Sequence, residues 1–348
     1  MQCNLKISMW KYIEITAHRA LLNFWSQLFN ITVKVKSMKN QQNPNPKQFN
    51  KNEDAGSYTL HAEDYYQNEI ILAKPFAKKM MQIAHITPDQ KVLDVGTGPG
   101  ILAFQVASNL SGNGTITGVD LSSDMIKTSQ LHAKKNGVSN SKFSIMDAEN
   151  LEFTDNEFDS VISMRTMHHI PNVDKALNEI MRVLKPGGGF SISIGSRIPP
   201  WRHGRLKSYA TAITRELKSK INSDLIAPNF ITRLSSKLLH EIPEPVHTSW
   251  GGHEPEKTLL KHIKKAGFLI ENTQWLYNIV PITSVDEFWK YQLAVVTEVR
   301  KRYQSANPGL QKIFKNEFYR QSKRALENNK QLYYCASLFA IGGRKAQY

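Results

Sequence analysis

The 348-residue sequence is poor in cysteine, in long apolar runs and, near its start, in acidic residues. Its two cysteines, Cys3 and Cys335, are too few and too widely separated to suggest a disulfide framework or a cysteine-based zinc site. This low cysteine content fits a reducing compartment, and we expect a cytoplasmic protein. No apolar run approaches the ~18 uninterrupted residues that a membrane-spanning helix requires. With 41% hydrophobic residues, the composition is that of an ordinary globular protein.

Positive charge is the unusual feature of the composition. The formal net charge is +15, and residues 1–50 contain seven Lys and Arg but only one acidic residue, Glu14. A basic surface attracts nucleic acid, anionic lipid or an acidic substrate, so charge alone does not choose among these partners.

Residues 1–56 are predicted to be a basic N-terminal extension and a polar linker, ahead of a folded domain at 57–348. Residues 9–29 carry apolar side chains at helical spacing, with basic residues among the polar positions. This pattern fits an interfacial amphipathic helix that contacts a membrane peripherally, or a targeting peptide. Two alternatives remain open: the segment is a dispensable extension, or the protein begins at Met38 and the preceding residues come from an upstream start. Residues 37–56 are rich in Asn, Gln and Pro, which is typical of a linker.

A glycine turn lies at the centre of the predicted fold, in residues 92–100, which read VLDVGTGPG. The β-favouring residues before the turn predict a buried parallel strand, and residues 101–110 after it predict a helix. Glycines let backbone N–H groups approach a ligand closely, and a helix N-terminus favours polar groups, so this turn is a candidate ligand site. A dinucleotide fold is the alternative. Its fingerprint requires GxGxxG, whereas the third glycine here, Gly100, comes one residue early.

Two further predicted strands end in a carboxylate. Residues 114–120 form a second strand that ends at Asp120, and a third strand ends at Asp147. Ligands of such sheets bind at the carboxyl ends of the strands, so both carboxylates are candidates for contact with a ligand. Asp120 could instead cap a helix, but Ser122 can serve as the cap for a helix at 123–135.

Four segments in this order resemble class I S-adenosylmethionine-dependent methyltransferases. Residues 92–100 resemble motif I of these enzymes, and residues 114–120 have the position of their second strand. Residues 147–161 resemble the DAENLPF-x-D-x-x-FD-x-V signature of the ubiquinone/menaquinone-biosynthesis methyltransferases. The segment RVLKPGG at 182–188 is characteristic of the same enzymes. The chain is therefore similar to the methyltransferase-11 type of this family.

The resemblance implies an α/β fold with a Rossmann-like, seven-stranded, mostly parallel sheet and helices on both faces. Strands one to five would be parallel and the seventh antiparallel. The core motifs cover 90–195, with a turn at 185–189 before the fifth strand. A helical cap is expected at 197–254, a helical insertion at 282–330, and the seventh strand at 337–345.

A helix is also expected before the first strand. Residues 70–83 have the apolar spacing of helical segments, with an interruption around Pro75. Methyltransferases of this class commonly carry such a helix with an aromatic residue near the cofactor. Tyr65 and Tyr66 are the candidates for that residue.

The resemblance further implies a cofactor, S-adenosyl-L-methionine. Asp120 would accept hydrogen bonds from the ribose hydroxyls, and Asp147 would accept one from the adenine amino group. The Ala148 backbone N–H would face a ring nitrogen, and Met125 would lie against the adenine ring. The full predicted set is Asp94, Gly96, Thr97, Gly98, Gly100, Asp120, Met125, Asp147 and Ala148.

The catalytic candidates are His168 and His169, in the loop after the fourth strand. Histidine accepts a proton near neutral pH. A base is needed only if the methyl acceptor must lose a proton. Glu152, His203 and His247 are weaker candidates. The sequence shows no recognisable metal site.

A small-molecule or lipid-like acceptor is favoured. Methyltransferases that act on amino groups of nucleic acid bases typically carry an Asn/Asp-Pro-Pro-aromatic segment after the fourth strand. Residues 164–166 read Met-Arg-Thr, with no ring to stack on a flipped base. A basic amphipathic segment at 205–221 fits contact with a membrane or an anionic substrate, or a solvated face. The alternatives are an RNA or protein methyltransferase and a non-catalytic cofactor-binding scaffold, and the oligomeric state is open.

Overall fold

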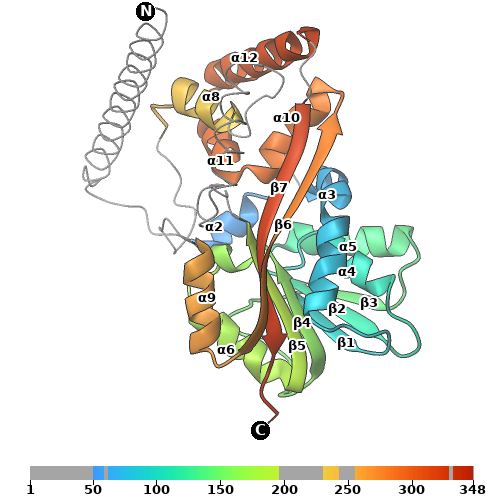
Figure 1. Cartoon of the computed structure of the whole chain (residues 1–348). Helices are drawn as coiled ribbons and strands as arrows, with labels where there is room; N and C mark the ends of the chain where they lie inside the picture. The colour runs from blue at the N-terminus through green and yellow to red at the C-terminus, as the bar shows by residue number, and fades with distance from the viewer. Residues whose placement is uncertain (1–49, 59–61, 196–229, 243–254, 329–331, 348) are drawn as a thin grey trace, which may run out of the picture. The chain divides into compact units, whose positions relative to one another are not determined.

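The computed structural model describes residues 50–58, 62–195, 230–242, 255–328 and 332–347, which lie in one compact unit that spans 49–348. In this part of the chain a seven-stranded sheet has the strand order β3-β2-β1-β4-β5-β7-β6 (Figure 1). The bounds of the first five strands are β1 Lys91–Val95, β2 Thr115–Asp120, β3 Ser141–Ile145, β4 Phe158–Met164 and β5 Leu184–Gly195.

The first five strands are parallel, and the last two are not parallel to each other. β7 (Leu332–Arg344) pairs antiparallel with β5, and β6 (Leu269–Ile282) pairs antiparallel with β7. The predicted fold class and strand directions are therefore confirmed. Because β1 to β4 run in one direction, the residues that follow them gather at a single edge of the sheet.

Helices cover both faces of the sheet, and the pleat of β1 shows why. Val92 belongs to the apolar cluster under α3 (Ala62–Ile83), α4 (Ile101–Ala107) and α5 (Ser123–Lys135). The next residue, Leu93, belongs to the cluster on the opposite face. Successive side chains of a strand point to opposite faces, so a strand buried on both sides is apolar throughout.

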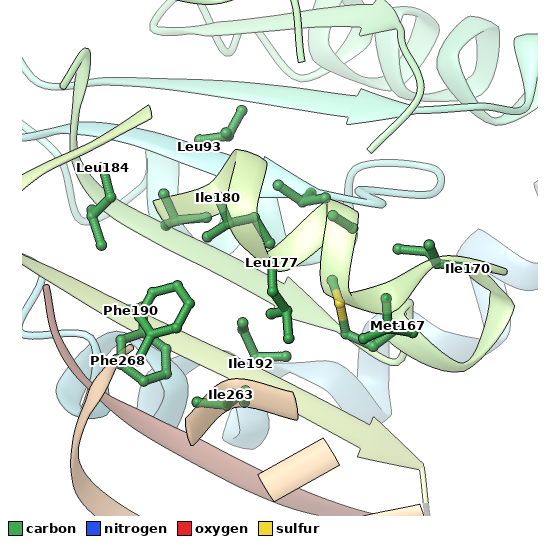
Figure 2. Close-up of a cluster of buried hydrophobic side chains, with 14 of the residues drawn as sticks. Leu93, Met167, Ile170, Leu177, Ile180, Leu184, Phe190, Ile192, Ile263 and Phe268 are labelled. Carbon is green, nitrogen blue, oxygen red and sulfur yellow. The ribbon is translucent and has the colours of Figure 1, made fainter. Parts of the chain in front are cut away.

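The opposite face is covered by α6 (Val173–Val183) and α9 (Pro255–Lys265) (Figure 1). Figure 2 shows Leu177 and Ile180 of α6 and Ile263 of α9 pointing into the same cluster as side chains of the sheet. Asn172 precedes α6 and accepts a hydrogen bond from the Lys175 backbone N–H, which caps the start of the helix.

A second core lies at the far end of the long β6–β7 hairpin. Both strands extend past the part of β7 that pairs with β5, and helices pack around this extension (Figure 1). These helices are α8 Phe230–Leu238, α10 Val285–Val295, α11 Thr297–Ser305 and α12 Pro308–Glu327. The helical content expected at 282–330 is thus present. Pro308 begins α12, where its missing N–H is not needed.

The predicted interruption around Pro75 is wrong, because α3 continues through it. A proline inside a helix removes one backbone hydrogen bond. Here the buried residues on either side, Ala73, Phe76, Ala77 and Met80, pack into the core and hold the helix together.

Other predicted boundaries also differ. The third strand ends at Ile145 and not at Asp147, and the helix expected at 101–110 ends at Ala107. The residues expected as a turn at 185–189 belong to β5, and a Cβ on Gly189 would lie 1.9 Å from the Ala84 carbonyl oxygen, so glycine is required there. The seventh strand begins at Leu332, because it pairs with the extended β6. A helix, α2 (Lys51–Gly56), lies in the sequence range predicted as linker, and Asn50 caps it through its side-chain oxygen.

Other expectations fall outside the described residues. These are the segment 1–49, the basic segment 205–221, and most of the helical cap expected at 197–254. None of the helices in the described part of the chain has the length and apolarity needed to span a bilayer.

Candidate functional site

A cavity lies where the strands β1 to β4 end. The space between its walls is about 870 Å³, a figure that includes open solvent. Its walls come from α2, the glycine turn, the ends of β2, β3 and β4, and the short 3-10 helix η2 (Met167–His169). The polar and glycine residues of the wall are Lys51, Asp54, Tyr58, Tyr65, Gly96, Gly98, Asp120, Ser122, Asp147, Glu149, Arg165, Thr166 and His169.

The glycine turn borders this cavity through Gly96 and Gly98. Gly96 has φ +71°, and a Cβ there would lie 2.1 Å from the Thr166 side chain. Gly98 has φ +56°, and a Cβ there would meet no atom within 4 Å. Glycine at 96 is therefore required by the fold itself, whereas the space beside Gly98 is left open toward the cavity.

Asp120 ends β2 at the cavity wall. Its carboxylate accepts hydrogen bonds from the Gly98 N–H at 2.8 Å and the Ser122 N–H at 2.9 Å. Burial raises the pKa of Asp120 above its ordinary value, although these two backbone donors lower it. Ser122 in turn caps α5 by accepting from the Met125 N–H, as predicted, whereas the ribose role of Asp120 stays a prediction.

Asp94 lies behind the turn and does not line the cavity. It is 1% exposed, and one carboxylate oxygen, Oδ2, accepts from the Thr97 hydroxyl at 2.8 Å. The other, Oδ1, has no hydrogen-bond donor among the described residues. Burial raises the pKa of Asp94 to about 7. Thr97 and Gly100 also lie outside the cavity lining, so these three predicted residues support the turn from behind.

Asp147 and Ala148 line the cavity beyond β3, together with Met125 from α5. Lys51 of α2 reaches Asp147 Oδ2 at 2.6 Å and Glu149 Oε1 at 3.4 Å. Burial alone would raise the pKa of Asp147, but the Lys51 ammonium holds it below its usual value. The edge expected to face an adenine ring is therefore partly closed by α2.

The two candidate histidines differ in position. His169 lines the cavity, and its Nδ1 lies 2.7 Å from Asp54 Oδ2 of α2. His168 does not line the cavity and packs against the His169 ring at 3.9 Å between centroids. Burial alone would raise the pKa of Asp54, but hydrogen bonds from His169 and from Lys301 of α11 lower it to about 2.

Of the remaining candidate residues, some line the cavity and others do not. Tyr65 lines the cavity, whereas Tyr66 stacks on the ring of His132 at 3.6 Å and belongs to the core. Glu152 is exposed and lies outside the lining. His203 and His247 lie outside the described residues.

Sequence reasoning missed Lys51, Asp54 and Arg165. For α2 a signal was present, since Asn50 followed by the acidic pair at 53 and 54 is typical of a helix N-terminus. Arg165 has φ +60°, uncommon for a residue with a side chain, and pairs with the fully buried Glu69 of α3. No local pattern predicts that pair, because it joins residues far apart in the chain.

The features around the turn fit a polar ligand of the size of a nucleoside. The open space beside Gly98 and the carboxylate of Asp120 border the same cavity. A carboxylate held by two backbone donors keeps lone pairs for further donors, as ribose hydroxyls would supply. No cluster of three or more metal-ligating side chains occurs in the described ranges.

Comparison with known proteins assigns the class. Residues 86–247 match a family model described as a methyltransferase domain. Together with the sheet order and the site, this match shows that the chain contains a class I S-adenosylmethionine-dependent methyltransferase domain, as the sequence predicted. S-adenosylmethionine is the cofactor of that class.

Three curated relatives illustrate the range of the family. Phosphoethanolamine N-methyltransferase 2 of Caenorhabditis elegans is 35% identical over 144 residues, which cover 41% of this chain and 32% of the relative. The uncharacterized methyltransferase YcgJ of Bacillus subtilis is 30% identical over 133 residues, with coverages of 38% and 51%. The ubiquinone/menaquinone biosynthesis C-methyltransferase UbiE of Hydrogenovibrio crunogenus is 26% identical over 213 residues, with coverages of 61% and 77%. The matched region thus spans a third to a half of the first two relatives.

Solved structures of similar proteins include a putative methyltransferase of Bacillus halodurans. It aligns with 78% of this chain and 98% of its own, with a TM-score of 0.47 and 22% identity. Phosphoethanolamine N-methyltransferase 2 of Haemonchus contortus, in complex with S-adenosyl-L-methionine, aligns with 78% of this chain and 53% of its own. Its TM-score is 0.42 and its identity 20%.

Proposed function

We propose that this protein transfers a methyl group from S-adenosylmethionine to a small-molecule or lipid-like acceptor. The observation that carries the proposal is the cavity at the strand ends, where the open space beside Gly98 adjoins the Asp120 carboxylate. When bound, the cofactor supplies a methyl group on a sulfonium centre, whose leaving thioether is neutral. In-line displacement then depends mainly on positioning and on exclusion of water.

Six of the cavity residues have a role in this proposal. Asp120 accepts from the ribose hydroxyls, Asp147 and the Ala148 N–H face the adenine edge, and Met125 packs on the ring. His169 takes a proton from the acceptor when the acceptor carries one. Glycine at 98 lets the backbone approach the cofactor.

The names of the relatives support a small acceptor but not a particular atom. One is a phosphoethanolamine N-methyltransferase and another a ubiquinone/menaquinone biosynthesis C-methyltransferase. Nitrogen and carbon acceptors therefore occur among proteins of similar sequence. Methylation of RNA or protein and a non-catalytic scaffold are the competing functions. A cytoplasmic location, with peripheral membrane contact through residues 1–50, is part of the proposal.

Calorimetry with S-adenosylhomocysteine tests cofactor binding. Asp120→Asn removes a charged acceptor, so we expect a loss of roughly 1.5–3 kcal/mol, about tenfold to 150-fold in Kd. Asp155→Asn is the matched control, since Asp155 is exposed and pairs with Arg182 away from the cavity. A change under about threefold in Kd for the folded Asp120 variant would contradict the ribose role.

The acceptor class is tested with methyl-labelled S-adenosylmethionine. Purified protein is mixed with separate metabolite, lipid, RNA and protein fractions of a cell extract. We expect label in the metabolite or lipid fraction. Label in RNA or protein alone would show that the acceptor is that macromolecule and not a small molecule or lipid. Cofactor binding without any methyl transfer would favour a non-catalytic scaffold.

A further inference from the structure

The helix α2 brings a buried carboxylate against the histidine of the cavity. Asp54 is 2% exposed, and its Oδ2 lies 2.7 Å from His169 Nδ1. Its other oxygen, Oδ1, pairs with the Lys301 ammonium of α11. Lys301, Asp54 and His169 come from three segments that are distant in the chain. Asp54 lies between the other two, and His169 lies at the cavity wall.

This arrangement determines where the proton of a neutral His169 ring lies. The hydrogen bonds from His169 and Lys301 keep the pKa of Asp54 at about 2, although burial alone would raise it, so its carboxylate is ionised at neutral pH. An ionised carboxylate only accepts hydrogen bonds, so Nδ1 must be the donor. The neutral ring then carries its proton on Nδ1 and a lone pair on Nε2.

We propose that Asp54 is a positioning residue that makes Nε2 of His169 the proton acceptor of the reaction. The inference rests on the proposed function and narrows it to acceptors whose methylated atom, oxygen or nitrogen, carries a proton. Carboxylate–imidazole pairs serve this purpose elsewhere by holding one tautomer and stabilising the imidazolium that forms.

The step balances in atoms and charge. The acceptor atom forms a bond to the methyl carbon while the bond from that carbon to sulfur breaks, and its electron pair stays on sulfur. The proton of the acceptor atom passes to Nε2. The positive charge that the donor loses reappears on the imidazolium, beside the Asp54 carboxylate.

Other charged and titratable groups also face His169. Asp120 at the end of β2 is a second carboxylate close enough to interact with it electrostatically. Tyr58 meets the ring edge-on at 6.1 Å, and the His168 ring lies at 3.9 Å. Among the groups that the structure describes, the Lys301 ammonium offsets the charge of Asp54. These groups add to the field at the ring, but Asp54 is the one that hydrogen-bonds to Nδ1.

Lys301 makes the substitution Asp54→Asn informative. The ammonium only donates, so it holds the carbonyl oxygen of the introduced amide and turns the NH₂ group toward His169. Nδ1 must then accept, and the ring proton moves to Nε2. The variant therefore has the same shape as the wild type with the wrong tautomer.

The test is nitrogen-15 NMR of the histidine ring at a pH where the ring is neutral, in the full chain without cofactor. In the wild type we expect a protonated Nδ1 and an unprotonated Nε2 on His169. In Asp54→Asn we expect the reverse, an unprotonated Nδ1 and a protonated Nε2. In Asp54→Asn/Lys301→Met the amide is free to rotate, so the Nδ1-protonated form partly returns. Label transfer to the cell-extract acceptor falls about 100-fold or more in Asp54→Asn.

The chain contains a matched control on its surface. Asp174 of α6 accepts from His262 Nδ1 at 2.5 Å and pairs with Lys265 of α9, which repeats the same three residue types away from the cavity. Asp174→Asn should exchange the signals of His262 and leave those of His169 and the rate of methyl transfer unchanged.

The outcomes separate this inference from the proposed function. Failure of the wild type to bind S-adenosylhomocysteine would remove the methyltransferase proposal whatever the tautomer. Binding of that ligand by a wild type whose His169 carries its proton on Nε2 would overturn the role of Asp54 alone. So would an Asp54→Asn variant that has exchanged tautomers but transfers methyl groups at the wild-type rate.

Discussion

At the scale of single residues, the two glycines that line the cavity have different neighbours. A Cβ on Gly96 would overlap the Thr166 side chain at 2.1 Å, whereas one on Gly98 would enter open space. Both have positive φ, so both carry the backbone strain of a left-handed residue once substituted. Only Gly96 adds a steric conflict inside the folded protein.

We therefore expect Gly96→Ala and Gly98→Ala to separate stability from binding. Gly98→Ala costs about 1–2 kcal/mol in the free energy of unfolding, from the backbone alone, and weakens binding of S-adenosylhomocysteine. Gly96→Ala costs more in stability, because Thr166 must move. Denaturant unfolding and calorimetry measure the two effects. Equal stability losses, or unchanged affinity for Gly98→Ala, would contradict the assignment.

Asp94 makes the stability depend on pH. Its pKa of about 7 in the folded protein exceeds the ordinary value of 3.8, because burial disfavours the charge. The folded state therefore keeps this proton where the unfolded state loses it. The contribution of Asp94 is fully present below about pH 4 and is lost as the pH rises through about 7.

The substitution Asp94→Asn removes this dependence. Relative to the variant, the wild type should lose roughly 3–4 kcal/mol of unfolding free energy between pH 4 and pH 8. Denaturant unfolding of both proteins across that range measures the difference. A difference that stays constant with pH would show that Asp94 is ionised in the folded protein.

At the scale of elements, α2 connects the sheet edge to the helices of the hairpin. Lys51 pairs with Asp147 after β3, and Asp54 pairs with His169 and with Lys301 of α11. Arg300 of α11 lies over the Tyr58 ring at 4.2 Å. A six-residue helix thus makes charged contacts both at the sheet edge and with α11.

Two truncated chains test the role of α2. A chain that begins at Phe49 keeps Asn50 and α2 and should match the full chain in stability and in cofactor affinity. A chain that begins at Ser57 leaves Lys301 without its buried carboxylate, so we expect a loss of about 2–4 kcal/mol. Denaturant unfolding and calorimetry decide. Equal stability of the two chains would show that α2 contributes little to the fold.

At the scale of the whole molecule, the net charge of +15 is the unusual property. Residues 1–50 carry a larger share of it than their length would predict. If this segment is an interfacial helix, the full chain should sediment with anionic liposomes, and added salt should weaken the binding by screening.

The chain that begins at Phe49 is the control for this membrane prediction. It should remain in the supernatant while keeping its affinity for S-adenosylhomocysteine. Sedimentation of both chains would instead assign the membrane contact to basic residues after 49, such as those at 205–221. Neutral liposomes show whether charge or apolar contact dominates.

The sequence by itself determined the glycine turn and placed Asp120 and Asp147 at the ends of the second and third strands, whereas the order of the strands came from the structure. Each of these features depends on residues that are close together in the chain, so a local pattern carries it. Gly96, Gly98 and Ser122, for example, are defined by turn and cap geometry that spans a few residues.

Only the tertiary structure decided which candidates meet in the cavity. It placed His169 and Tyr65 at the cavity and His168 and Tyr66 away from it. Neighbouring residues of one element point in different directions, so they face different parts of the protein. It also joined Asp54 to Lys301 across 247 positions of the chain. No local pattern predicts such a pair, since it exists only after α2 and α11 have come together in the fold.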